Sequence, residues 1–285
     1  MGFSPHKRFL ACVVLAMIAW WPALHVLVTA AVADENYSYT LLVLAVSVVL
    51  LALDLWDSSG QPGAAIPTWL SLPVLCLALF AAAWFNFRIP FRGGDFSLTI
   101  SIFLWICFLL AVFLSTYGWD SFSHQRFPWM FPFLAVPLPD RAINLLITVL
   151  QWGSADAAYL LFRVFRIPVV RDGLVFSFSK IDLEVARECS SIRSSTLLIV
   201  TTLVIAQLFL KSTRSMLIVV LLSLPVAVLK NGVRIFTLSV LAEYVSTGWL
   251  DSWVHHQGGF IFLLLGLGIM LTLIWLMGRV EARQT

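Results

Sequence analysis

The chain has 285 residues, of which 60% are hydrophobic and only 12% are charged. Its apolar residues gather in runs close to the length that a bilayer core of about 30 Å requires, which the core of a soluble protein does not explain. The formal net charge of +3 is spread along the chain without a block of Lys and Arg, so no nucleic-acid partner is expected. This composition indicates the lipid bilayer as the partner.

The apolar runs predict an all-α polytopic membrane protein with about eight transmembrane helices. These runs are residues 9–32, 39–53, 68–85, 98–115, 127–136, 192–210, 215–229 and 260–277. The first run follows His6, Lys7 and Arg8 and ends near an Ala-x-Ala sequence, as a signal peptide does. At about two dozen residues it is too long for a signal peptide, and it is expected to be an uncleaved first helix with its basic end inside.

The character of the chain changes after about Arg126. Prolines at 128, 132, 137 and 139 break the helical pattern, and residues 142–165 then predict a long, partly amphipathic helix. Beyond it lies the only substantial non-membrane stretch. There, β-rich segments flank an Asp172-Gly173 turn, which predicts a small hairpin above the membrane surface.

Three groups of ionisable residues lie at the ends of apolar runs, where charged groups are costly and are therefore candidates for function. They are residues 188–195, 230–235 and 255–259. At about 1.5 Å per helical residue, Cys189 lies some 31 Å from Leu210, Arg234 roughly 29 Å from Ser215, and His255 about 36 Å from Arg279. Each of these lengths is near the thickness of a bilayer core, so Cys, Arg and His are expected at one interface.

Cysteine, arginine and histidine at one interface form a plausible nucleophilic site. A thiol at the first turn of a helix feels the positive end of the macrodipole, and a nearby Arg or His lowers its pKa further. Backbone N–H groups of that turn, together with the Arg234 guanidinium, can hold an oxyanion. A histidine can then protonate a leaving amine and deprotonate an acceptor.

A structural role for the same residues stays open. Cys189 can be a small interfacial residue, Arg234 and Lys230 can extend to headgroups, and the His255-His256 pair can cap the last helix. The serines after Cys189 can cap a helix or ease helix packing, and Ser190 or Ser191 is a weaker nucleophile than the thiol.

No metal or cofactor is expected. Of the five histidines, His6 and His124 belong to the other side of the membrane and His25 lies within the first run. Adjacent His255 and His256 would point about 100° apart on a helix, which disfavours a tetrahedral metal site with Cys189. No phosphate-binding or dinucleotide-binding glycine loop is present.

From about residue 127 to 262 the sequence resembles the exosortase/archaeosortase family of membrane-embedded cysteine transpeptidases. The resemblance rests on the order and spacing of several short elements. They are the proline-rich stretch 127–139, Leu150-Gln151, Val185-Ala186-Arg187-Glu188-Cys189-Ser190, Asn231-x-x-Arg234-Ile235, and His255 four residues before Gly259. The family pattern of a Cys, an Arg in Asn-x-x-Arg and a His before the last helix falls on Cys189, Arg234 and His255. Asn231, Arg193 and Ser190 would support them, and Ser191 stands where the family usually has Gly.

This resemblance implies a division into N-terminal helices (1–126), a catalytic core (127–278) and a cytoplasmic tail (279–285). It implies substrates that are exported proteins with a C-terminal tail made of a short signature such as Pro-Glu-Pro, one transmembrane helix and a basic cluster. Cys189 would cleave near the signature and pass the acyl group to a surface acceptor of unknown identity. In many bacteria this work is associated with exopolysaccharide production.

Two other functions remain as alternatives. One is a non-catalytic transporter or assembly component for surface polysaccharide, with Arg and His along a pathway, although no repeated halves are visible. The other is a serine intramembrane peptidase, for which no Gly-x-Ser-x-Gly sequence is present. The basic N-terminus predicts cytoplasmic ends and an active site at the extracytoplasmic face of the inner membrane, although more Lys and Arg fall on the proposed outer side.

Overall fold

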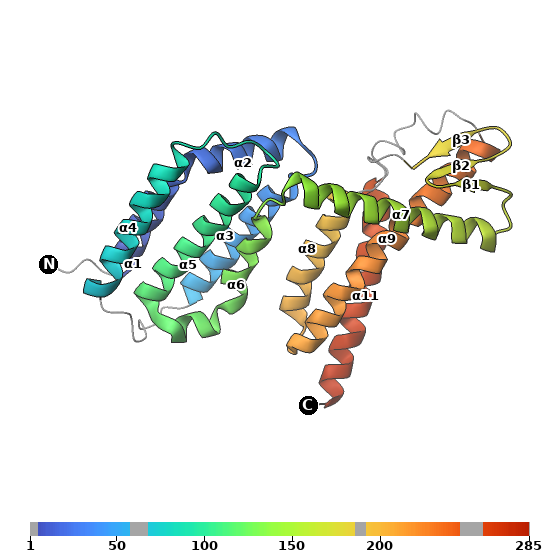
Figure 1. The fold of residues 1–285 in the computed structure, drawn as a ribbon. Coiled ribbons are helices and arrows are strands. Elements are labelled where there is room, and N and C mark those ends of the chain that lie inside the picture. Colours follow the sequence, from blue (N-terminus) through green and yellow to red (C-terminus); the bar gives the residue numbers. More distant parts are fainter. Residues whose placement is uncertain (1–4, 58–67, 186–191, 246–258, 285) are drawn as a thin grey trace. The chain divides into compact units, whose positions relative to one another are not determined.

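The computed structural model describes residues 5–57, 68–185, 192–245 and 259–284. It divides into two compact units, Met1–Ile143 and Asn144–Thr285, each with its own apolar core (Figure 1). The helix that joins them, α7, begins in the first unit and continues into the second. This division describes packing, and the catalytic core expected for residues 127–278 stays a prediction.

The first unit is a cluster of helices. Its elements before α7 are α1 (Pro5–Ala19), α2 (Trp21–Ala33), α3 (Tyr39–Asp57), α4 (Thr68–Asn86), α5 (Phe96–His124), α6 (Arg126–Met130) and the 3-10 helix η1 (Phe131–Ala135). Helix α5 is interrupted at Gly118, whose φ of 84° is readily adopted only by glycine. The apolar run predicted to end at residue 115 therefore stops just before this interruption.

The first apolar run is not one continuous helix, as the sequence predicted. It forms α1 and α2, which meet at Trp20 with a bend of 71°. Pro22 accounts for the break, because its ring lacks an N–H and clashes with the preceding helical turn. The bend is held by a buried polar chain in which Trp20 Nε1 donates to the Ser101 carbonyl (2.9 Å) and Ser101 Oγ donates to Asn86 Oδ1 (2.6 Å).

The run at 127–136 is not a spanning helix, which corrects the prediction. It forms α6 and η1, each of only five residues. At about 1.5 Å and 2.0 Å per residue these cover less than the thickness of a bilayer core of about 30 Å. Pro128 and Pro132 lack the N–H groups that a continuous helix needs.

The start of α7 is fixed within the first unit by Asp140. Its carboxylate accepts a hydrogen bond of 2.8 Å from the Tyr37 hydroxyl, and its backbone N–H donates to the Gly94 carbonyl at 3.0 Å. Gly94 has a φ of +83°, and a Cβ there would overlap the Asp140 carboxylate. Burial and the hydrogen bond to Asp140 raise the pKa of the Tyr37 phenol, so this group stays a neutral donor.

The second unit combines a helical bundle with a small sheet (Figure 1). Its elements are α7 (Asp140–Val164), β1 (Val170–Asp172), β2 (Val175–Ser177), β3 (Asp182–Glu184), α8 (Ile192–Phe209), α9 (Thr213–Tyr244) and α11 (Gly259–Gln284). Helices α8, α9 and α11 pack against one another around Leu198, Ala206, Val219, Ala227, Met270 and Ile274. A second core joins α7, the sheet and the end of α9 around Ala158, Phe162, Phe176, Val185 and Ile235.

The hairpin expected around Asp172-Gly173 is confirmed. Strands β1 and β2 are antiparallel, with Asp172 paired to Val175, and Gly173 supplies the positive φ of 59° that the turn requires. A third strand, β3, which the sequence did not predict, pairs antiparallel with β2. The protein is therefore mostly helical with one three-stranded sheet.

The predicted count of eight spans is not confirmed. Among the described residues, four helices are long and apolar enough to cross a membrane, and the bent pair α1–α2 makes five. These four are α5, α7, α9 and α11. Of these, α7 had been expected only as a partly amphipathic helix. Three further apolar segments, Tyr39–Leu53, Ser71–Asn86 and Arg193–Phe209, are shorter. Several long apolar helices in one chain make this a multi-pass membrane protein.

Candidate functional site

A buried lysine joins the three helices of the bundle at one level. Lys230 of α9 is only 2% exposed, and its Nζ donates a hydrogen bond of 2.6 Å to Ser194 Oγ in the first turn of α8. Its aliphatic stem passes Gly266 of α11, where an added Cβ would lie 3.1 Å from Lys230 Cδ and 3.3 Å from a methyl group of Leu198. Gly266 thus leaves the room through which the lysine reaches α8.

One residue further along, α9 crosses α7 at close range. Asn231 is buried, and its Nδ2 donates to Ser154 Oγ at 2.9 Å. Gly232 permits the crossing, because a Cβ there would lie 2.5 Å from the Ala157 Cβ and 3.1 Å from the Ala158 nitrogen. The Asn231-x-x-Arg234 segment is therefore held against α7 on one side while Lys230 reaches α8 on the other.

The chain around Val185 is fixed by α7. Gln151 of α7 is buried, and its Nε2 donates a hydrogen bond of 2.8 Å to the carbonyl of Val185. Val185 is fully buried and is joined to Leu174 by a backbone hydrogen bond of 2.9 Å. Gln151 thus positions the last described residue before Cys189.

A buried carboxylate ties the sheet to the end of α9. Glu243 accepts hydrogen bonds from Ser179 Oγ and, at 3.1 Å, from the backbone N–H of Lys180, in the turn between β2 and β3. The Lys180 ammonium donates in turn to the Glu243 carbonyl at 3.0 Å. Carboxylates are disfavoured at helix C-termini, so these contacts offset an unfavourable position in the macrodipole.

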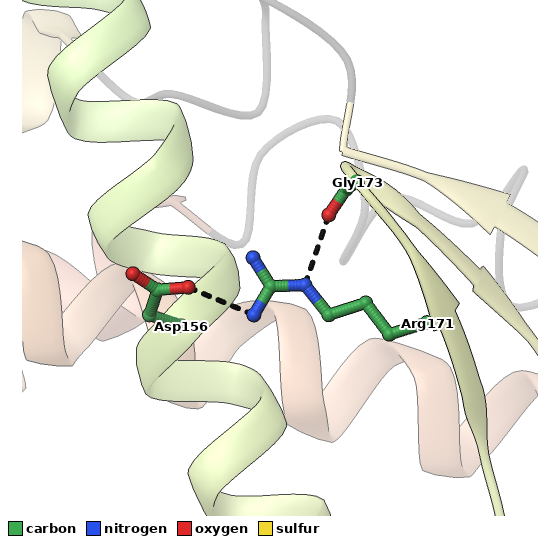
Figure 2. Close-up of polar contacts among 3 residues, drawn as sticks. All are labelled: Asp156, Arg171 and Gly173. Atoms are coloured by element: carbon green, nitrogen blue, oxygen red, sulfur yellow. Dashed lines mark hydrogen bonds and ion pairs between the residues drawn. The ribbon is translucent and has the colours of Figure 1, made fainter.

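The hairpin is clamped to α7 by Arg171. Figure 2 shows its guanidinium between Asp156 of α7, at 2.8 Å from Oδ1, and the Gly173 carbonyl, which accepts from Nε at 2.9 Å. The same guanidinium lies over the rings of Tyr159 and Phe176, with centroid distances of 5.5 and 5.7 Å. Asp156 is exposed, so the ion pair mainly orients Arg171 and contributes little stability by itself.

The structure describes three of the predicted site residues. Arg234 is half-buried in α9, one helical turn beyond Lys230; Asn231 is buried between α9 and α7; Arg193 is exposed in the first turn of α8. Because Lys230 contacts Ser194, the turn of α9 that carries Arg234 lies near the start of α8. Cys189, Ser190 and His255, like His256, lie outside the described residues.

The sequence did not predict the buried hydrogen bonds of Lys230, Gln151 and Glu243. Lys230 was considered only as an interfacial cation, because the sequence does not reveal that Gly266 opens a path for it toward Ser194. A usable signal was present for Glu243, since a single acid near the C-terminal end of an apolar helix requires a local partner. In the part of the chain that the structure describes, no cluster of three or more His, Cys, Asp or Glu side chains is placed to hold a metal ion.

Comparison with known proteins places the chain in a family. The family model described as transmembrane exosortase (Exosortase_EpsH) matches residues 20–272, which is most of the sequence. Neither a curated protein nor a solved structure gave a significant match. Since this match covers well over half of the chain, the chain belongs to the transmembrane exosortase family.

Proposed function

We propose that this protein is a membrane-embedded cysteine transpeptidase, with Cys189 as nucleophile, Arg234 as oxyanion donor and His255 as acid and base. Family membership supports the general activity of a transmembrane sorting transpeptidase. Asn231, Arg193 and Ser190 are proposed as supporting residues of this site, within a catalytic core at residues 127–278.

The observation that carries the proposal is the contact between Lys230 and Ser194. It brings the turn of α9 before Arg234 beside the first turn of α8. Cys189 precedes the first residue of α8 by three positions, so the covalent chain keeps its Cα within about 11 Å of the Cα of Ile192. This contact therefore supports a site in which the turn of α9 before Arg234 lies beside the helix start that Cys189 precedes in the sequence.

The proposed reaction has two halves. The Cys189 thiolate attacks the carbonyl carbon of a peptide bond in the substrate, and the negative oxygen of the tetrahedral intermediate is stabilised by Arg234 and by backbone N–H groups of the helical turn that follows Cys189. The C–N bond then breaks, His255 gives its proton to the leaving amine, and a thioester remains. An acceptor nucleophile, deprotonated by His255, attacks the thioester, and the C–S bond breaks to restore the thiolate.

The proposed substrates are exported proteins with a C-terminal signature, a transmembrane helix and a basic cluster. The released acyl group would go to an acceptor at the cell surface. We place the site at the extracytoplasmic face of the inner membrane, because such substrates have already crossed it.

The test compares processing of a tailed substrate in cells that carry the wild-type chain or Cys189→Ala. We expect Cys189→Ala to abolish removal of the tail while leaving the chain in the membrane at normal levels. Cys107→Ala, which removes a thiol within α5, is the matched control and should process normally. A second measurement is a covalent enzyme–substrate adduct that hydroxylamine releases, as expected for a thioester. Substrate of mature size in cells with only Cys189→Ala would rule out this nucleophile and favour a non-catalytic role.

A further inference from the structure

We propose that α7 lies along the membrane surface, with one apolar flank in the lipid, although its length and composition are those of a spanning helix. The proposal concerns the face of the bilayer at which α8 begins, and it does not depend on the proposed catalytic role. The partner is the boundary between lipid headgroups and acyl chains.

The first observation is the crossing of α7 and α9. Figure 1 shows α7 lying across the ends of α8 and α11, whereas α9 runs alongside these two helices. The contacts between α7 and α9 support this view. Gly153 of α7 meets Val228, and Ser154 and Ala157 meet Asn231 and Gly232. Two helices that ran side by side across a membrane would instead contact each other along their lengths.

The second observation is how far α9 rises at this crossing. From Val228 to Ile235, which packs with Ala158 and Phe162, α9 advances seven residues, or about 10 Å at 1.5 Å per residue. That rise is about the diameter of one helix with its side chains. Over the same stretch the contacts on α7 run from Gly153 to Phe162, so the two helices cross obliquely, and α9 rises past the width of α7 between these contacts.

The order of these contacts shows which flank of α7 faces the membrane interior. Val228 lies closer than Ile235 to the turn at Lys211 and Ser212, which is bound to Glu281 at the opposite end of the bundle. Val228 meets Gly153, whereas Ile235 packs with Ala158 and Phe162. At 100° per residue, the flank of α7 that carries Gly153 therefore faces toward the hydrocarbon.

That flank is apolar along its whole length. At 100° per residue, Leu146, Val149, Leu160 and Val164 lie within about 40° of Gly153. Val149, Leu160 and Val164 are 58%, 62% and 65% exposed, so nothing in the described part of the second unit covers them. Apolar side chains of α9 are exposed on either side of Val228, at Leu224 and Leu229, so the flank continues the lipid-facing surface of the bundle.

The polar side chains of α7 lie opposite this flank or at its edge. Thr148 is about 140° from Gly153, and Asn144 is almost opposite it, both exposed. Asp156 and Arg163, about 60° and 80° from Gly153, are exposed at the edge of the flank. A spanning α7 would place Asp156 near the middle of the bilayer, where a charge is costly. A surface helix instead keeps these groups in water while the apolar flank enters the acyl boundary.

The experiment uses two adjacent positions that lie on different flanks of α7 but at nearly the same height along its axis. Thr148→Cys and Val149→Cys are made in the full chain, in open membranes, and labelled with a maleimide carrying polyethylene glycol. We expect Thr148→Cys to react at least about tenfold faster than Val149→Cys, because apolar surroundings raise a thiol pKa and each unit lowers the thiolate fraction tenfold. Leu160→Cys should react as slowly as Val149→Cys.

Three outcomes decide the proposal. Fast labelling of Thr148→Cys with slow labelling of Val149→Cys supports a surface helix in contact with lipid. Slow labelling of both until detergent is added would show that α7 spans the bilayer and would overturn the proposal. Fast labelling of both would place the whole helix in water and would also overturn it. Each variant is compared with the wild-type chain, whose native cysteines are labelled in parallel. Reaction of the new cysteine appears as one additional gel shift.

Discussion

Lys230 Nζ donates a hydrogen bond of 2.6 Å to Ser194 Oγ inside a mainly apolar helical bundle. A buried ammonium requires such a partner, because its loss of hydration is not offset by apolar contacts. The pair links the Asn231-x-x-Arg234 segment of α9 to the first turn of α8, and its energetics are measurable.

Ser194→Ala should lower the free energy of unfolding by about 1–3 kcal/mol, because it removes a partner of the buried lysine. Lys230→Met keeps the length of the side chain but removes the charge, and it should be neutral or stabilising. The double variant should be as stable as Lys230→Met alone. Unfolding in detergent micelles measures these values.

In the same variants, processing should fall with Lys230→Met even where stability is kept, since the positive charge next to the proposed site is lost. Thr272→Ala, which removes only an exposed hydroxyl that is hydrogen-bonded within α11, serves as the control. Additive effects of Ser194→Ala and Lys230→Met on stability would contradict the coupling.

Gly232→Ala should destabilise the protein by about 1–3 kcal/mol, because the new methyl group overpacks the crossing with Ala157 and Ala158. Gly268→Ala makes the same chemical change in α11, where a Cβ would meet nothing within 4 Å. It should be neutral or stabilise by up to about 1 kcal/mol through helix propensity. Thermal unfolding of the two variants compares them directly, and equal effects would show that the close crossing is unimportant.

Glu243→Ala should loosen the turn between β2 and β3, since Ser179 and the Lys180 amide lose their acceptor. A loss of about 1–3 kcal/mol corresponds to roughly 5- to 150-fold faster opening of this turn. Trypsin cleavage after Lys180 measures the opening. Asp182→Ala, an exposed acid in β3, is the matched control and should leave the cleavage rate unchanged.

Arg234→Lys should reduce processing by about 10²–10³-fold if the guanidinium is an oxyanion donor. An ammonium keeps the charge but cannot reproduce the planar fork of donors. Arg193→Lys tests the same exchange at the exposed arginine of α8 and should have a smaller effect. Rates of tail removal at equal enzyme levels give the comparison, and equal losses in both variants would contradict the assignment to Arg234.

His255→Ala should stall processing, whereas His256→Ala should leave most of it. The family pattern points to His255, and two adjacent residues diverge by about 100° if the pair begins the final helix, in which case only one can face the proposed site. An unperturbed imidazole titrates near neutral pH, as an acid and base requires. The fraction of uncleaved substrate in cells with each variant measures the effect, and the reverse order would assign the role to His256.

Apolar periodicity predicted most of the helices, because a bilayer imposes both length and composition on them. This prediction failed in segments that proline residues interrupt. Pro22 turned one expected helix into two, and the prolines after Arg126 reduced an expected span to two short helices. The hairpin at Gly173 was predictable because its turn chemistry is local, whereas β3 depends on pairing with a neighbouring strand.

The site was predictable only in part for a related reason. Motif spacing singled out Asn231 and Arg234 as candidates, but Ser154 and Ser194, which bind Asn231 and Lys230, come from helices distant in sequence. Their pairing depends on Gly232 and Gly266, which permit close approach of neighbouring helices. Such long-range packing leaves no periodic signal in a single sequence.

Helix α9 has a consequence for how the second unit unfolds. It runs without interruption from Thr213 to Tyr244, with Ala227 in the core of the bundle and Ile235 in the core beneath the sheet. Two cores that share one continuous helix lose their packing together when that helix melts. We therefore expect the amides of Phe176 in the sheet and Val219 in the bundle to exchange with solvent deuterium through one common opening event, so that the sheet and the bundle form a single cooperative folding unit.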